Sequence, residues 1–243
     1  HMLNLSDKRV LVTGVSSAIG AEIAHTILGL GGTVVGTYRT SDSVLLEQLS
    51  MQDGFESFHW DVFTEPKFLE GQQGFDAWVH CIGAINPQPI KYLNKEGSEG
   101  LFQVNYFSAS RMASLLLKQN LLLPKAAVVF LSSVSSHYPY RGGAAYASSK
   151  AALETFAKAL ALELSSKQIR VNTLVCGLVR SPMFDASKSS YSTTEIEAME
   201  AKYPLGIGTP SDVAKPCAFL LSDYAAWISG AQLLLDGGLM LNV

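Results

Sequence analysis

Apolar runs of strand length alternate with longer stretches of helical periodicity along most of this chain. The strand-like runs are Arg9 to Thr13, Thr33 to Tyr38, Phe55 to Trp60, Ala77 to Cys81, Ala127 to Leu131, Arg170 to Val175 and Gln232 to Leu235. The helical patterns cover residues 18 to 30, 100 to 119, 145 to 166 and 211 to 222. Continuous apolar strands separated by helices are typical of a parallel sheet that is covered on both faces. The pattern therefore predicts the α/β class, with one doubly wound parallel sheet.

The composition fits one globular domain. Hydrophobic residues make up 48% and charged residues 16% of the 243 residues, a balance typical of a folded core rather than of a disordered chain. No linker rich in proline, glycine or serine divides the sequence, so we expect a single domain over residues 3 to 243. His1 and Met2 resemble a cloning remnant and are left out of the interpretation.

Charge and cysteine content narrow the possible partners. The net charge of −3 gives no general attraction to nucleic acid or to an anionic membrane, so neither is expected as a partner. The longest apolar runs are of strand length, far short of a membrane span, and no export signal opens the chain. Cys81, Cys176 and Cys217 lie far apart without a Cys-x-x-Cys pair, which favours reduced thiols. We therefore expect a cytoplasmic protein without a metal site.

A glycine-containing segment, VTGVSSAIG over residues 12 to 20, joins the first strand to the first helix. Gly14 permits a tight turn, and Gly20 lets the helix pack close to the sheet. The N-terminus of the helix then offers free N–H groups and a positive dipole end to a pyrophosphate. A lone glycine motif also occurs in ordinary βα turns, but its place after the first strand favours a dinucleotide site in a Rossmann fold.

The end of the second strand indicates which dinucleotide is bound. An acidic residue there favours NAD, whereas an arginine accommodates the 2′-phosphate of NADP. The sequence reads GTYRTSD, so Arg39 occupies this place and offers a forked donor for phosphate. We predict NADP(H) rather than NAD(H). Asp42 lies close, and an ordinary surface arginine is the alternative interpretation.

The segment AYASSKAAL, residues 144 to 152, places Tyr146 one helical turn before Lys150. Taken alone, this pair means only that two side chains share a helix face. An unperturbed tyrosine titrates near pH ~10 and is a weak acid–base group at neutral pH, whereas a nearby cation favours its phenolate. The pair is therefore either a packed aromatic beside a solvated amine, or a proton donor beside a cation that shifts its pKa.

Further motifs stand in a fixed order along the chain. They are Asp61-Val62 after the third strand, QVNYFSA with Asn105, VVFLSSVSS with Ser133, YASSK, IRVNTLVCGLVRSPM and the terminal ISGAQLLLDGG. Together with TGVSSAIG, they cover the chain nearly end to end. The chain thus resembles the short-chain dehydrogenase/reductase family, in particular its 3-oxoacyl-carrier-protein-reductase-like branch.

The resemblance implies a catalytic tetrad. Tyr146 would be the general acid that protonates the carbonyl oxygen, and Lys150 would support it and bind the nicotinamide ribose. Ser133 would hold the substrate oxygen, and Asn105 would anchor a water in a proton relay. Each residue has an ordinary alternative: a core aromatic, a solvated lysine, a strand-end serine and a helix-kinking asparagine.

The resemblance also implies which residues bind the cofactor and the substrate. The predicted cofactor-binding residues are Gly14, Ser16, Ser17, Ala18, Ile19, Gly20, Arg39, Asp61, Val62, Cys81, Gly83, Tyr146, Lys150 and Val179. The predicted substrate-binding residues are Ser133, His137, Tyr146, Gly177 and Met183. Residues 181 to 204 interrupt the α/β rhythm and correspond to the family's flap over the substrate, which excludes water during reaction. An ordinary turn is the alternative explanation for Asp61.

Three positions depart from the family pattern. Ala18 stands where the middle glycine of the phosphate loop is usual, and it adds a methyl group beside the cofactor. His80-Cys81-Ile82-Gly83 replaces Asn-Asn-Ala-Gly after the fourth strand, so the backbone contact of the first asparagine passes to His80 or is lost. Cys176-Gly177 replaces Pro-Gly after the sixth strand, with Cys176 expected to be a small buried residue. None of these changes removes a catalytic group.

The expected function is NADPH-dependent reduction of a ketone to a secondary alcohol, on a small or carrier-bound substrate such as a 3-oxoacyl thioester. A sugar or polyol dehydrogenase of the same family is the alternative, because the same tetrad serves both. A nucleotide-sugar epimerase is disfavoured, since those relatives have a larger C-terminal substrate portion. A non-catalytic dinucleotide sensor is the alternative from another class. Relatives assemble through the two long helices and the last strand, so we expect a homotetramer or homodimer.

Overall fold

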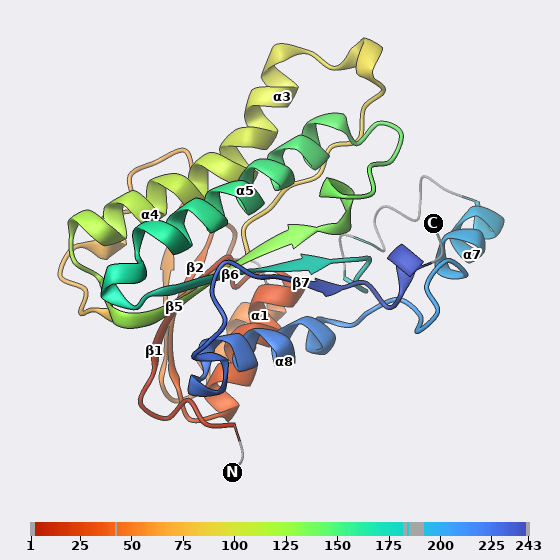
Figure 1. Cartoon of the computed structure of the whole chain (residues 1–243). Coiled ribbons are helices and arrows are strands. Elements are labelled where there is room, and N and C mark those ends of the chain that lie inside the picture. Colours follow the sequence, from red (N-terminus) through yellow and green to blue (C-terminus); the bar gives the residue numbers. More distant parts are fainter. Residues whose placement is uncertain (1–2, 42, 182–183, 185–191, 242–243) are drawn as a thin grey trace.

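The computed structural model describes residues 3–41, 43–181, 184 and 192–241. Within them, seven strands form one parallel sheet in the order β3-β2-β1-β4-β5-β6-β7 (Figure 1). The strands are β1 (Arg9–Thr13), β2 (Thr33–Tyr38), β3 (Phe55–His59), β4 (Phe75–His80), β5 (Leu122–Ser133), β6 (Arg170–Cys176) and β7 (Gln232–Leu235). The predicted α/β class and parallel sheet are confirmed.

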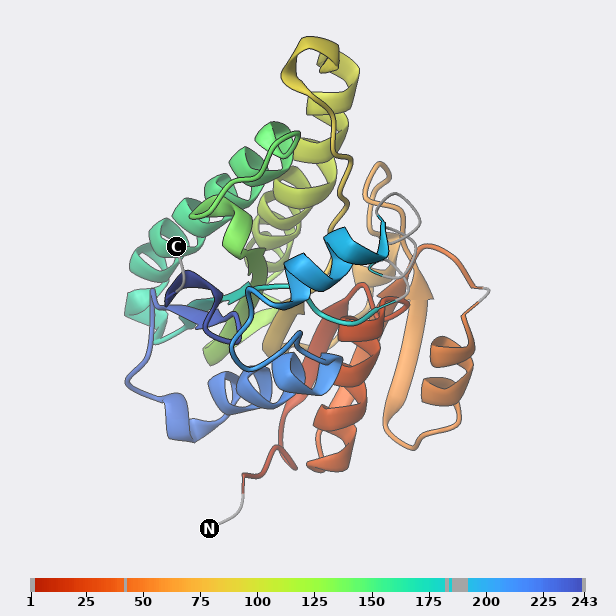
Figure 2. The same cartoon turned by 90° about the vertical axis from the view of Figure 1, so that its right-hand side faces the viewer.

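Helices cover both faces of this sheet (Figure 1 and Figure 2). The α-helices are α1 (Ala18–Gly29), α2 (Val44–Ser50), α3 (Lys95–Phe102), α4 (Ser108–Lys118), α5 (Ala144–Glu163), α7 (Thr193–Glu200) and α8 (Pro210–Leu221), of which α3 and α7 extend beyond the sheet. α4 and α5 cover one face, and α1 and α8 pack against each other on the other face. Because all strands are parallel, their carboxyl ends meet at one edge of the sheet.

The alternation of side chains along each strand divides the core into two layers. In β1, Val10 and Val12 pack on the side of α1 and α8, whereas Leu11 packs on the side of α4 and α5. All three side chains are fully buried. Burial on both faces is why such strands read as continuous apolar runs rather than as an alternating pattern.

Some element boundaries differ from the sequence prediction. β5 begins at Leu122, five residues before the apolar run that indicates it. The helical pattern over residues 100 to 119 begins earlier, at Lys95, and includes a π-helical turn, Gln103–Phe107, between α3 and α4. The hydrophobic pattern did not indicate α2. A local signal fixes its start instead, because the Ser43 side chain caps the helix by accepting from the N–H of Leu46.

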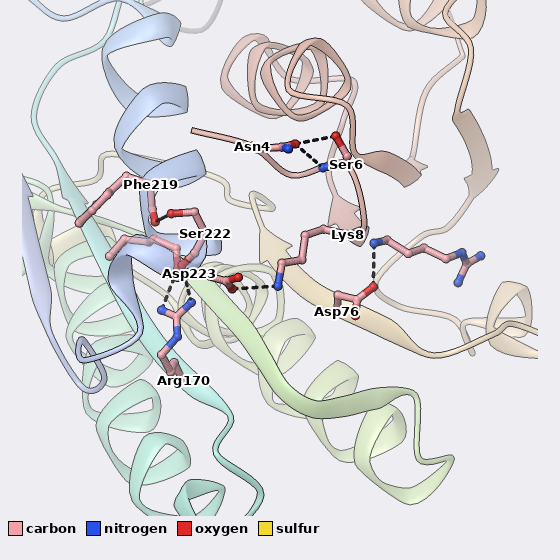
Figure 3. Close-up of polar contacts among 10 residues, drawn as sticks. Asn4, Ser6, Lys8, Asp76, Arg170, Phe219, Ser222 and Asp223 are labelled. Atoms are coloured by element: carbon pink, nitrogen blue, oxygen red, sulfur yellow. Dashed lines mark hydrogen bonds and ion pairs between the residues drawn. The ribbon is translucent and has the colours of Figure 1, made fainter. Parts of the chain in front are cut away.

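Polar contacts fasten the amino-terminal edge of the sheet (Figure 3). Lys8 Nζ, just before β1, lies 3.1 Å from a carboxylate oxygen of Asp223. Arg170, the first residue of β6, donates hydrogen bonds to the carbonyl oxygens of Leu220 and Ser222 at the end of α8. Lys8 and Arg170 at this edge therefore have structural partners.

The predicted substrate flap lies only partly within the described residues. Phe184 is buried, and α7 begins at a capping box in which Ser192 and Glu195 each bond the backbone of the other. Met183, a predicted substrate-binding residue, and Asp42 lie outside the described residues. Across the part of the chain that is described, no helix is both long and apolar enough to cross a bilayer.

Candidate active site

The strand order changes direction between β1 and β4, which are neighbours in the sheet but not in the chain. Ligands of doubly wound sheets bind at the carboxyl ends of the strands beside such a point. The predicted phosphate loop follows β1, Cys81 and Gly83 follow β4, and Ser133 ends β5. The fold thus brings these residues to one edge, where α5 adds Tyr146 and Lys150.

Tyr146 lies in the first turn of α5, and the nearby Ser133 side chain, at the end of β5, influences its pKa. Burial raises the pKa of the Tyr146 hydroxyl, and the Ser133 side chain lowers it by less. The sequence led us to expect that Lys150 would favour the phenolate. In the structure burial dominates, because a phenolate is poorly stabilised away from water. Tyr146 is therefore a neutral hydroxyl, the form that a proton donor needs.

Lys150 follows on the same face of α5 and is buried, which excludes a solvated surface amine. Its Nζ donates a hydrogen bond to the carbonyl oxygen of Leu131 at 2.9 Å and lies 6.0 Å from the centre of the Tyr146 ring. Burial lowers the pKa of Lys150 to about 8, and the nearby Glu154 is one of the groups that oppose this shift. The amine is thus charged at neutral pH but loses its proton far more readily than in water.

Asn105 is fully buried at the π-helical turn before α4. Its Oδ1 accepts from the N–H of Ala84 at 2.7 Å, and its Nδ2 donates to the carbonyl oxygen of Ala84 at 2.9 Å and to Ser149 Oγ at 3.0 Å. Asn105 therefore ties the loop after β4 to α5, beside Tyr146. π-helical turns often occur at functional sites. The predicted water relay through Asn105 stays a prediction.

Gly83 and Gly14 leave space beside the strand ends, and a larger side chain at either position would fill that space. A Cβ atom at Gly83 would lie 3.3 Å from Lys150 Nζ and 3.5 Å from Asn105 Oδ1. Gly14 has a φ of 96°, and a Cβ atom there would lie 3.2 Å from the backbone of Cys81. Both positions lie on the predicted cofactor path between the loops after β1 and β4, which fits a ligand that touches the backbone closely.

The start of α1 fits a phosphate group. Ser17 caps the helix by accepting from the N–H of Gly20 at 3.1 Å, and a Cβ atom at Gly20 would lie only 2.2 Å from the carbonyl oxygen of Gly14. N–H groups in the first turn of a helix have no partner within it, and those of Ala18 and Ile19 stand in this turn. The residues present therefore fit a pyrophosphate that is held by backbone N–H groups.

The predicted adenosine end lies at the ends of β2 and β3. Arg39 is exposed directly after β2. Asp61 Oδ1 accepts a hydrogen bond from the N–H of Phe63 at 3.0 Å, so this carboxylate forms a turn, and Val62 is buried. The predicted contacts of these residues with adenosine stay predictions.

His80 is fully buried at the end of β4. Its Nδ1 lies 2.8 Å from Thr13 Oγ1, and its Nε2 lies 3.0 Å from Ser108 Oγ. Ser108 donates its own hydrogen to the carbonyl oxygen of Val104 at 2.6 Å, so Nε2 must carry the proton that bonds Ser108. Burial, with a smaller contribution from Lys150, lowers the pKa of His80 to about 3. The neutral ring links β1, β4 and α4 through side-chain contacts. The backbone of the loop after β4 is bound by Asn105.

Cys81 and Cys176 pack near the site as protonated thiols. Burial raises the pKa of the Cys176 thiol to about 12 and raises that of Cys81 further. Cys176 is buried, as expected. Within the described residues, no group of three or more His, Cys, Asp or Glu side chains could hold a metal ion.

The predicted substrate side lies beyond Ser133. His137 follows it by one short helical turn and has 43% of its side chain exposed. Gly177 follows β6, where a Cβ atom would lie 2.9 Å from the ring of Tyr203. Gly177 thus has a packing reason to be glycine. Val179 pairs with Gly208 in an isolated bridge, and substrate or cofactor contacts of these residues stay predictions.

Sequence reasoning missed one buried charge at the site. Glu154 has only 5% of its side chain exposed and accepts hydrogen bonds from Ser132 and Gln232. It stands four residues after Lys150 and eight after Tyr146, so the three share one face of α5. That spacing, on a helix face that packs on the sheet, was the signal that could have indicated it.

Comparisons with known proteins agree with this geometry. The family model described as Enoyl-(Acyl carrier protein) reductase matches residues 14–240. D-erythrulose reductase of Gallus gallus is 31% identical, with 99% of this chain and 98% of the relative covered. The 3-oxoacyl-[acyl-carrier-protein] reductase of Vibrio cholerae is 27% identical over 98% of this chain and 99% of the relative. A short-chain type dehydrogenase/reductase from Mycobacterium ulcerans has a similar structure, with a TM-score of 0.84, 26% identity, and coverage of 98% of this chain and 92% of that one. The chain therefore belongs to the short-chain dehydrogenase/reductase family of NAD(P)-dependent oxidoreductases.

Proposed function

We propose that this protein is an NADPH-dependent reductase that converts a ketone to a secondary alcohol, with Tyr146 as the general acid. The observation that carries the proposal is that Tyr146, with the Ser133 side chain nearby, lies one helical turn before the buried Lys150, whose Nζ is 6.0 Å from the centre of the Tyr146 ring. These groups stand at the carboxyl ends of the strands, beside glycines that fit a dinucleotide. Family membership supports the class of reaction.

Each residue has a distinct part in the proposed reaction. The nicotinamide, when bound, supplies the hydride. Ser133 holds the carbonyl oxygen by a hydrogen bond, and Tyr146 donates its proton to that oxygen as negative charge develops on it. Lys150, charged below its pKa of about 8, stabilises the phenolate that remains on Tyr146. Asn105 fixes the loop and the helix that carry these groups.

We assign the preference for NADPH to Arg39, which is exposed at the end of β2 where a 2′-phosphate would lie. In the variant Arg39→Glu, kcat/KM for NADPH should fall about tenfold or more, because a planar cation is replaced by a charge that repels phosphate. The value for NADH should change by less than about threefold. Steady-state kinetics with both cofactors measure this. Equal losses with NADPH and NADH would contradict the assignment.

Two relatives indicate the class of substrate. The 3-oxoacyl-[acyl-carrier-protein] reductase of Vibrio cholerae matches this chain nearly end to end, which supports a 3-oxoacyl thioester as the substrate. D-erythrulose reductase of Gallus gallus matches it over a similar length at higher identity. A small hydroxyketone of the sugar or polyol class is therefore the second candidate.

The test follows NADPH and NADH absorbance with a panel of a 3-oxoacyl thioester, diketones and oxidised sugars. We expect oxidation of NADPH with at least one ketone, faster than oxidation of NADH. The substrate with the highest kcat/KM then assigns the class. Tight binding of NADPH with no turnover on any carbonyl of the panel would contradict the proposal and support a non-catalytic dinucleotide sensor.

We further propose a homotetramer or homodimer that works in the cytoplasm. Apolar side chains stand exposed on the elements expected at the interfaces: Leu162 near the end of α5, Leu234 in β7 and Leu241 after it. Their burial against a second copy would remove apolar surface from water. The three free thiols of the described residues support a reducing compartment.

A further inference from the structure

Glu154 is a buried carboxylate with donors on both of its oxygens. Ser132 Oγ and Ser136 Oγ each lie 2.5 Å from Oε1. Gln232 Nε2 at the start of β7 donates to Oε2 at 2.5 Å, and His137 Nε2 lies 3.0 Å from the same oxygen. These donors come from the end of β5, the turn after it and β7. Burying a carboxylate is costly unless it is hydrogen-bonded in this way, so the cluster has a reason to keep its geometry.

The donors flank the proposed catalytic serine. Ser132 precedes Ser133 directly, and Ser136 Oγ lies 2.7 Å from the carbonyl oxygen of Ser133 as well as beside Glu154. Ser136 has one hydroxyl hydrogen, so it donates to one of these two acceptors at a time. Glu154 therefore holds both sides of the short segment that carries Ser133. A small displacement of such a group lowers the rate steeply.

Glu154 also acts on the charge of Lys150. It stands one helical turn after Lys150 on α5. Burial lowers the pKa of Lys150, and Glu154 opposes this shift together with the larger effects of Cys176 and Cys81. The other titratable groups that face Lys150 are His80 on β4, Cys81 after it, Cys176 at the end of β6 and Tyr146 on α5. Of these neighbours, Glu154 is the carboxylate.

We infer that Glu154 is a positioning residue of the reductase reaction, which fixes the Ser133 segment and keeps Lys150 charged. This inference rests on the proposed function. It assigns two separable effects to one side chain. The hydrogen bonds hold Ser133, and the negative charge supports Lys150.

Two variants separate these effects. Glu154→Gln removes the charge but keeps a planar group with a donor and an acceptor, so the alkaline limb of the pH profile of kcat should move to lower pH. The double variant S132A/S136A keeps the charge but removes two of the bonds, so kcat should fall about tenfold or more with the alkaline limb in place. KM for NADPH should stay within about twofold in both. Glu163→Gln, at the exposed end of the same helix, is the matched control and should leave kcat and the pH profile unchanged.

A second readout does not depend on turnover. In protein with ¹³C-labelled lysine, the Lys150 signal, assigned by its loss in Lys150→Met, should titrate at lower pH in Glu154→Gln than in the wild type. If wild type reduces no carbonyl, the proposed function fails while this titration still tests Glu154. An unchanged titration together with wild-type kcat in S132A/S136A would overturn the inference. If Glu154→Gln does not fold, Glu154→Asp takes its place, with lower kcat and an unmoved alkaline limb as the expected result and wild-type kcat as the contrary one.

Discussion

At the scale of single residues, the site depends on side chains whose burial changes their protonation. Lys150 is the clearest case, because an amine that is charged in water is enclosed between α5 and the sheet. Its pKa of about 8 means that the folded protein holds this proton less tightly than the unfolded chain does. The proposed reaction needs the charged amine, whereas burial favours the neutral one.

This conflict predicts a trade between stability and activity. In Lys150→Met, turnover should be lost. The folded pKa is lowered, so wild type gains stability relative to this variant as pH rises from about 8 towards the unfolded value of 10.5. Over about 1.5 pH units of that window the gain should be about 2 kcal/mol. Urea unfolding of both proteins at pH 8 and pH 9.5 measures it. A stability difference that is independent of pH would contradict the burial of a titrating amine.

At the scale of elements, His80 joins three of them. It ends β4 and bonds Thr13 at the end of β1 and Ser108 at the start of α4. The ring therefore joins β1 and β4, between which the strand order changes direction, to α4 on the face of the sheet away from α1. His80 is thus a structural histidine, and Asn105 holds the loop backbone.

His80→Ala should lower the free energy of unfolding at pH 7 by about 2–4 kcal/mol, because it leaves a cavity and two hydroxyls without their partner. The folded pKa is about 3 and the unfolded value 6.5, so wild type loses stability as pH falls below 6.5 and the variant lacks this loss. At pH 5 the difference between the two proteins should be about 2 kcal/mol smaller than at pH 7. Denaturant unfolding at the two pH values measures it, and an equal difference at both would show that the ring is protonated in the folded state.

The hydrophobic pattern was sufficient to predict strands that consist of apolar runs. It was insufficient to predict elements whose bounds depend on polar residues. β1 and β2 were predicted with their observed bounds, because their side chains are buried on both faces. The start of β5 and helix α2 were missed, since each depends on local polar or tertiary contacts. Ser133, Tyr146 and Lys150 were placed by motif and do lie together. Glu154 was missed because its donors come from two segments distant in sequence, the end of β5 with its following turn and the start of β7, which periodicity alone does not bring together.

At the scale of the whole molecule, the parallel sheet explains why residues from distant segments meet. The loop after β1, the loop after β4, the end of β5 and the first turns of α5 all converge at one edge. The opposite edge is fastened by ion pairs and backbone contacts. The candidate site therefore lies at the edge of the sheet opposite these contacts.

The central claim is that Tyr146 donates the proton in carbonyl reduction. The most direct measurement compares wild type with Tyr146→Phe, which keeps the ring but removes the hydroxyl, using single-turnover oxidation of NADPH with the best ketone of the panel. We predict a rate about 10²–10⁴-fold lower, with the affinity for NADPH, measured by fluorescence, within about threefold of wild type. Turnover by Tyr146→Phe within about twofold of wild type would contradict the account.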